Sequence, residues 1–133
     1  MKELTLPSRI ESVDEAAMMA DEFARTNGFG DDVLSAVDLA VRESVANAVK
    51  HGNKFDEAKN VEFKILNAGD RLEITVRDFG TGFAVTDVPD PTDPENLLKV
   101  NGRGILFMRS FMDEVEWFNP PGGGMQVRMV KKR

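Results

Sequence analysis

The spacing of apolar residues along this chain changes period, and its first half has the spacing of helices. Apolar positions recur at helical intervals over residues 13–24 and again over residues 33–49, which predicts two amphipathic helices. Ser12 and Glu15 have the spacing of a capping box and are expected to begin the first helix. Gly52 is expected to end the second helix, because glycine commonly terminates helices.

The second half of the chain alternates apolar and polar residues instead. Val61 to Ile65 and Leu72 to Val76 alternate with a period of two, and the loop at 67–70 joins them, which predicts an antiparallel hairpin. The remaining expected elements are short: a strand at 4–7, a helix at 105–111, and strands at 115–117 and 125–129.

This order of elements predicts an α+β fold. Hairpins require antiparallel neighbours, and amphipathic helices bury their apolar stripes against a sheet. We therefore expect a two-layer sandwich, in which a mixed, mostly antiparallel sheet is covered on one face by three helices. The pattern indicates no repeat and no linker, so residues 1–133 are expected to form a single domain.

Composition narrows the possible functions. The formal net charge of −6 argues against a sequence-independent grip on nucleic acid, which needs a basic face. The chain has no cysteine, which excludes disulfides, thiolate chemistry and the usual zinc sites. No apolar stretch is long enough for a signal core or a membrane span, so we expect a soluble cytoplasmic protein without membrane contact.

The second predicted helix carries a polar pair on one face. Glu43 and Asn47 are four residues apart, so their side chains lie one turn above the other. The carboxamide oxygen of Asn47 suits Mg²⁺, which takes few protein ligands, and Glu43 suits a general base. For this helix considered alone, a solvated polar face is the better explanation of the pair.

Two glycine motifs follow in the chain. Asp78 ends a strand and precedes Gly80 and Gly82, which indicates either a turn or a pocket edge where backbone approaches a flat ligand. Gly102-Arg103-Gly104 opens a helix and indicates either a hinge or an anion site at the helix N-terminus. Between them, residues 84–101 have little periodicity, as is common in functional loops.

The order of these motifs resembles the Bergerat-fold (GHKL) ATP-binding superfamily of type II topoisomerases, MutL proteins and histidine kinases. The Glu43–Asn47 pair resembles its N box, and the two glycine motifs resemble its glycine boxes. More narrowly, residues 102–108 and 112–115 resemble those of anti-sigma-factor serine/threonine kinases, stand-alone proteins of bacterial partner-switching systems. The chain departs from that pattern at Met125, where relatives often have a threonine.

The resemblance implies ATP and Mg²⁺ as cofactors and a role for each motif. Asn47 would hold Mg²⁺ on the triphosphate, Asp78 would accept a hydrogen bond from the adenine amine, and Glu43 would be the general base. The other implied roles belong to the glycine motifs and the segment between them: Gly80 and Gly82 in the base pocket, residues 84–101 as the ATP lid, and Gly102, Arg103 and Gly104 at the phosphates.

Three functions remain open at this level. The first is an ATP-dependent kinase that phosphorylates a STAS-domain antagonist, also binds a sigma factor and forms a homodimer, as the resemblance implies. The second is a nucleotide-binding interaction module without kinase activity. The third is a histidine-kinase-like ATPase domain acting in trans. Glu43 favours the first over the second, because a protein that only binds nucleotide needs no base.

Overall fold

A computed structural model describes residues 1–80 and 104–133 of the chain. The expected lid at 84–101, together with Gly82, Gly102 and Arg103, lies outside the described residues. The elements run in the order β1 (Lys2–Pro7), α1 (Glu11–Thr26), α2 (Asp31–Asn47), η1 (Ala48–Gly52), β2 (Asn60–Asn67), β3 (Arg71–Arg77), α4 (Gly104–Phe111), β4 (Glu114–Phe118) and β5 (Gln126–Lys132).

The strands form one sheet in the order β1-β2-β3-β5-β4. The sequence prediction allowed a mixed sheet, but every pairing among the described strands is antiparallel. The expected hairpin joins β2 to β3, and its register sets Phe63 opposite Val76 and Ile65 opposite Ile74. Gly69, with φ of +96°, allows the tight turn between these strands.

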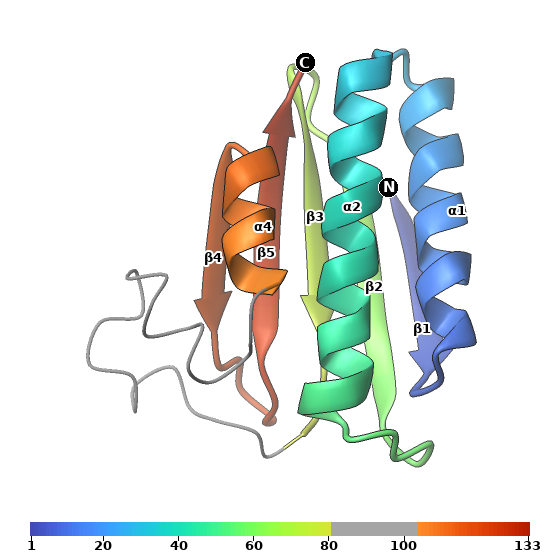
Figure 1. The fold of residues 1–133 in the computed structure, drawn as a ribbon, viewed down its shortest axis with the longest axis vertical. Helices are drawn as coiled ribbons and strands as arrows, with labels where there is room; N and C mark the ends of the chain where they lie inside the picture. The colour runs from blue at the N-terminus through green and yellow to red at the C-terminus, as the bar shows by residue number, and fades with distance from the viewer. Residues whose placement is uncertain (81–103) are drawn as a thin grey trace.

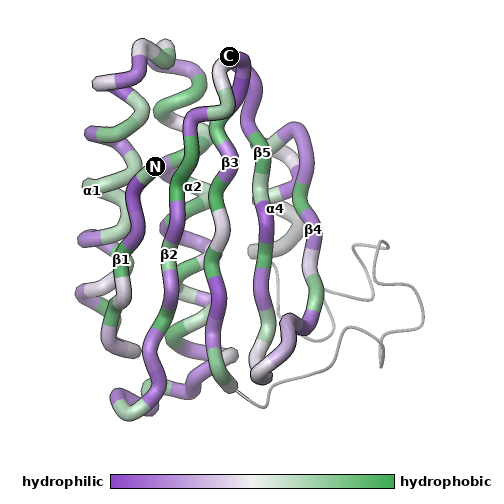
Figure 2. Tube along the Cα trace, turned by 180° about the vertical axis from the view of Figure 1, so that it is seen from behind, coloured by the Kyte–Doolittle hydropathy of each residue, from purple (hydrophilic) through white to green (hydrophobic). Residues whose placement is uncertain are grey.

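The helices α1, α2 and α4 cover one face of the sheet, so the predicted two-layer α+β sandwich is confirmed (Figure 1). From the other side, the strands show alternating hydrophobic and hydrophilic residues (Figure 2). In β2, Val61, Phe63 and Ile65 are buried while the residues between them are exposed. Burying each such side chain contributes roughly 1.5–3 kcal/mol. None of the helices in the described part of the chain has the length and hydropathy to cross a bilayer.

The predicted capping box is wrong. Helix α1 begins at Glu11, and no side chain caps its N-terminus. Ser12 lies inside the first turn, is 2% exposed and donates its hydroxyl proton to the carbonyl oxygen of Pro7 at 2.7 Å. A buried hydroxyl needs a partner, and the end of β1 supplies one. Ser12 therefore connects β1 to α1 instead of capping the helix.

The second helix changes geometry before it ends. After Asn47 the chain continues as the π-helical segment η1, in which the amide of Asn53 donates to the carbonyl oxygen of Ala48 at 2.8 Å. Helical structure ends at Gly52 as predicted, but for a different reason, because Gly52 does not have a positive φ. Single π-helical turns often occur at functional sites. This one presents Gly52 to the end of β3.

Candidate functional site

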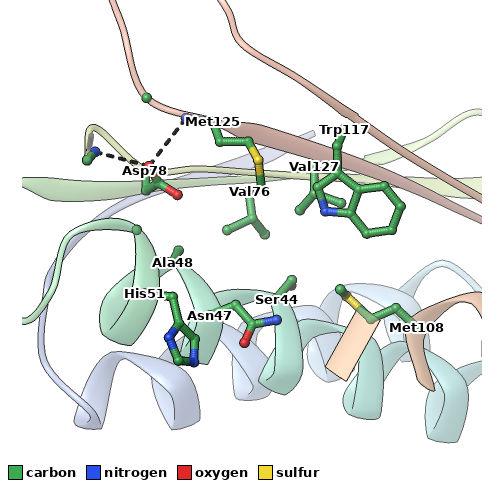
Figure 3. A pocket seen from close by; sticks show the side chains of 13 residues that line it. Ser44, Asn47, Ala48, His51, Val76, Asp78, Met108, Trp117, Met125 and Val127 are labelled. Atoms are coloured by element: carbon green, nitrogen blue, oxygen red, sulfur yellow. Dashed lines mark hydrogen bonds between the residues drawn. The ribbon is translucent and has the colours of Figure 1, made fainter. Parts of the chain in front are cut away.

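A pocket opens between the helix layer and the sheet, where α2 and η1 face the ends of β3 and β5 (Figure 3). Its floor and walls come from six elements and the loops beside them, far apart in sequence. The lining residues are Ser44, Asn47, Ala48, His51, Gly52, Val76, Asp78, Gly80, Met108, Trp117, Gly124, Met125 and Val127.

The helical wall is one face of α2 and η1. Ser44, Asn47, Ala48 and His51 lie at intervals of three and four residues, so they project from the same side of the helix toward the pocket. Of these four residues, only Asn47 is a candidate site residue from the sequence. The helical spacing around Asn47 is the signal that could have identified the other three residues.

Asp78 is the buried acid of the pocket, with 7% of its surface exposed. Its Oδ1 accepts hydrogen bonds from the backbone amides of Gly80 at 3.0 Å and Met125 at 3.3 Å (Figure 3). Its own amide donates to the carbonyl oxygen of Met125 at 2.9 Å. The described residues donate no hydrogen bond to Oδ2. This oxygen can therefore accept a hydrogen bond from a ligand.

Burial raises the pKa of the Asp78 carboxyl above its ordinary value, because desolvation disfavours the charged form. The hydrogen bonds from Gly80 and Met125, and the more distant charges of Lys59 and Arg77, act in the opposite direction and limit the rise. A hydrogen bond from a ligand would stabilise the charged form of this buried acid.

Glycines allow three backbone segments to meet around Asp78. A Cβ on Gly52 would lie 2.2 Å from Oδ2 of Asp78, and one on Gly80 would lie 1.6 Å from the carbonyl oxygen of Gly52. A Cβ on Gly124 would lie 1.9 Å from the carbonyl oxygen of Asp78. Any side chain at these positions would force η1, β3 and the loop before β5 apart.

The rest of the pocket is apolar. Val76, Met108 and Val127 are buried, while Trp117 is half-buried and packs against the core. Trp117 has two roles, because the side chain that packs against the core also lines the pocket. An apolar pocket with one buried acceptor suits a flat ring that carries an amine.

The structure brings together part of the predicted site. Asn47, Asp78 and Gly80 all line the pocket. Glu43 is half-buried one turn before Asn47 on α2 and does not line the pocket. Gly104 is the first residue of α4. No group of three or more His, Cys, Asp or Glu side chains that could hold a metal occurs among residues the structure describes.

Comparisons with known proteins agree with this architecture. A family model described as "Histidine kinase-like ATPase domain" matches residues 6–131. The chain is 27% identical over 134 residues to a serine-protein kinase RsbW of Listeria monocytogenes, covering 96% of this chain and 84% of the relative. It is 33% identical over 104 residues to an anti-sigma F factor of Anoxybacillus flavithermus, covering 75% of this chain and 70% of the relative.

A solved structure has the same fold. The catalytic domain of the histidine kinase ThkA superposes with a TM-score of 0.61 and 12% sequence identity, covering 99% of this chain and 97% of that chain. At this identity the likeness concerns the fold alone.

Proposed function

Because the chain belongs to the histidine kinase-like ATPase domain family, and within it to the group of RsbW-type serine-protein kinases and anti-sigma F factors, we propose that it is an ATP-dependent protein kinase and anti-sigma factor. In this proposal it binds ATP in the pocket around Asp78. It then transfers the γ-phosphate to a serine or threonine of a STAS-domain antagonist. A sigma factor is its second partner, and the cytoplasm, which contains ATP and sigma factors, is its location.

The proposal rests mainly on the hydrogen bonding of the Asp78 carboxylate. Backbone amides occupy Oδ1, while Oδ2 is left without a donor among the described residues, in a pocket that apolar side chains line in part. The exocyclic amine of adenine is a donor of the required kind, and the apolar side chains suit the faces of its ring. Guanine and hypoxanthine carry an oxygen at the same ring position, which the carboxylate would repel.

The pocket also suits the triphosphate and its Mg²⁺. Asn47 lies on the pocket wall, and Mg²⁺ is usually bound by one or two protein oxygens together with phosphates and waters. The absence of a larger acidic cluster among the described residues is compatible with such a site. Asn47 would hold the ion through its carboxamide oxygen. Bound Mg²⁺ would supply neutralisation of phosphate charge, and the Gly102-Arg103-Gly104 motif is assigned to the phosphates.

Glu43 is assigned the proton transfer. The hydroxyl oxygen of the acceptor serine or threonine would attack the γ-phosphorus, the bond to the bridging oxygen would break, and ADP would leave. Glu43 would accept the hydroxyl proton. Its place one turn from Asn47, outside the pocket lining, suits a group that faces the incoming protein substrate instead of the nucleotide base.

That same place supports a second candidate, a nucleotide-binding module that sequesters a partner without phosphorylating it. Glu43 is not among the residues that line the pocket, so nucleotide binding alone does not require a carboxylate there. A histidine-kinase-like domain acting in trans remains the third candidate, and it would label a histidine instead of a serine or threonine. The three candidates differ in the phosphorylated product, so one assay separates them.

The test incubates the protein with Mg²⁺, γ-labelled ATP and a candidate STAS-domain protein. We expect acid-stable label on the STAS protein, as phosphoserine or phosphothreonine gives. Glu43→Gln should slow labelling by about 10²–10⁴-fold, the usual contribution of a general base, and leave ATP affinity unchanged. Glu62→Gln, which changes an exposed residue of β2, is the matched control and should label at the wild-type rate.

Two results would count against the kinase assignment. Wild-type rates of labelling by Glu43→Gln would remove Glu43 as the base. Saturable ATP binding without label on the STAS protein would favour the binding module, and acid-labile label would favour the histidine-kinase-like activity.

A further inference from the structure

Asn53 is a buried polar residue that lies beside the pocket without lining it. It follows η1 directly, and 2% of its surface is exposed. A buried carboxamide must satisfy both its oxygen and its amide protons, and Asn53 does so with partners from three separate segments. Its Nδ2 donates to Ser8 Oγ at 2.9 Å and to the carbonyl oxygen of Asn60 at 3.0 Å. Its Oδ1 accepts from the amide of Phe79 at 2.9 Å.

The bond to Phe79 fixes the strand end that carries Asp78. The amides of Asp78, Phe79 and Gly80 are all hydrogen-bonded, and they point to different partners. The first donates to Met125, the third donates to Oδ1 of Asp78, and the second donates to Asn53. Asn53 is therefore the side chain that ties this strand end to the helix layer.

The backbones of η1 and of the segment after β3 lie so close together that neither can move far toward the other. A Cβ on Gly80 would meet the carbonyl carbon of Gly52 at 2.3 Å and the amide nitrogen of Asn53 at 3.2 Å. The backbones of η1 and of the segment after β3 thus touch directly where Asn53 joins them. A shift of Phe79 away from Asn53 would rotate the Asp78 carboxylate with it, because the two residues share a peptide unit.

The far side of Asn53 is equally well anchored. Ser8 is 1% exposed, and its hydroxyl donates to the carbonyl oxygen of Lys59 while accepting from Asn53. The network thus connects the β1–α1 junction and the start of β2 to the strand end that carries Asp78. This arrangement holds Asn53 in one orientation, with its oxygen toward Phe79.

We propose that Asn53 is a positioning residue for base recognition, which holds the Phe79 amide so that Oδ2 of Asp78 faces the adenine amine. This inference rests on the proposed ATP-binding function. Asn53 does not touch the nucleotide in this account and acts through Asp78. A purely structural asparagine would affect the stability of the fold and would leave the choice between bases unchanged.

The test compares ATP with ITP, whose hypoxanthine carries an oxygen where adenine carries the amine. For each variant, titration calorimetry gives the ratio of the two dissociation constants. We expect the wild type to prefer ATP, and Asn53→Ala to reduce this preference by about fivefold or more, the effect of weakening one hydrogen bond to a charged group. Asn67→Ala is the matched control, since it removes a half-buried carboxamide whose partners, Asn27 and Gly69, do not line the pocket, and it should keep the wild-type preference.

The outcomes separate this inference from the function on which it rests. Equal affinity of the wild type for ATP and ITP would contradict the assignment of Asp78 itself. A clear wild-type preference that Asn53→Ala retains would overturn the role of Asn53 alone. Asn53→Leu, which matches asparagine in branching and in the number of side-chain heavy atoms, serves if the alanine variant does not fold, and it should lose the preference in the same way.

Discussion

At the scale of the single residue, Asp78 is where structure and proposed function meet. Its carboxyl is buried, its Oδ1 is held by two backbone amides, and its Oδ2 accepts no hydrogen bond from the described residues. Burying a carboxyl group lowers the stability of the folded state, and such groups are found mainly where they bind a ligand or take part in chemistry. The raised pKa of Asp78 makes this cost measurable.

The sign of the effect on stability follows from that pKa. Burial raises the pKa of Asp78 in the folded protein above the ordinary value of 3.8, so the folded state binds this proton more tightly than the unfolded state. The favourable contribution of the neutral acid is complete at pH values below 3.8 and is lost as the pH rises toward the folded pKa. Above the folded pKa, the folded protein carries a carboxylate that would be better solvated after unfolding.

Asp78→Asn should therefore raise the melting temperature at neutral pH while weakening ATP binding by about tenfold or more, the value of a hydrogen bond to a charged acceptor. The gain in stability should shrink in acid, where the native carboxyl is also neutral. Thermal unfolding at several pH values, with ATP titrations beside it, measures both effects. Asp70→Asn, at an exposed residue of the β2–β3 loop, should change neither. A melting temperature of Asp78→Asn below that of the wild type at neutral pH would contradict this account.

At the scale of the element, the pocket depends on how closely η1 approaches the end of β3. Gly52 stands at this contact, where a Cβ would lie 2.2 Å from Asp78 Oδ2 and 2.9 Å from its Cβ. Real side chains do not come so close, so an added methyl group must push the helix end away from the strand or turn the carboxylate.

Gly52→Ala should destabilise the fold by about 1–3 kcal/mol, as overpacking does, and should abolish specific ATP binding because it blocks Oδ2. Gly30→Ala is a matched control. Gly30 has a φ of −79° at the start of α2, and no heavy atom lies within 4 Å of its added Cβ. Urea unfolding and ATP titration of both variants provide the measurement. Equal ATP affinities of the two variants would show that the contact at Gly52 does not shape the site.

The elements were largely predictable from sequence, because their signals are local. Alternation marked β2 and β3, and helical spacing marked α1 and α2 with its continuation in η1. Ser12 does not cap helix α1, because its hydroxyl group donates a hydrogen bond to the carbonyl oxygen of Pro7 instead. Sequence spacing says which side chains share a face, but not which distant acceptor competes for one of them.

The candidate site was predictable only in part, because its contacts join segments far apart in the chain. Asn47 and Asp78 follow from motif order, whereas the bond between Phe79 and Asn53 spans 26 positions and that between Met125 and Asp78 spans 47. The sequence predicted that Gly52 ends a helix. Its contact with Asp78 arises only when η1 and β3 pack together. Trp117 lines the pocket only because the fold brings β4 to it.

At the scale of the whole molecule, the helix layer and the sheet pack against each other over most of the core. They lie farther apart at one end, and the pocket forms there. The core fills the space between the helices and the sheet, from Phe63 and Ile74 to Met129. Where η1 leaves the sheet, the same packing leaves room above Val76 and Val127. We propose that Mg²⁺ and ATP occupy this room together, with Asn47 as the residue that couples them.

The most direct test of this claim is a calorimetric titration of ATP into the wild type and Asn47→Ala, each with Mg²⁺ and with EDTA. We predict saturable binding to the wild type that weakens when Mg²⁺ is removed. Asn47→Ala should bind at the magnesium-free level in both conditions, because the residue that couples the ion to the protein is gone. Unchanged affinity and an unchanged response to Mg²⁺ in Asn47→Ala, or no saturable binding of ATP to the wild type, would contradict the account.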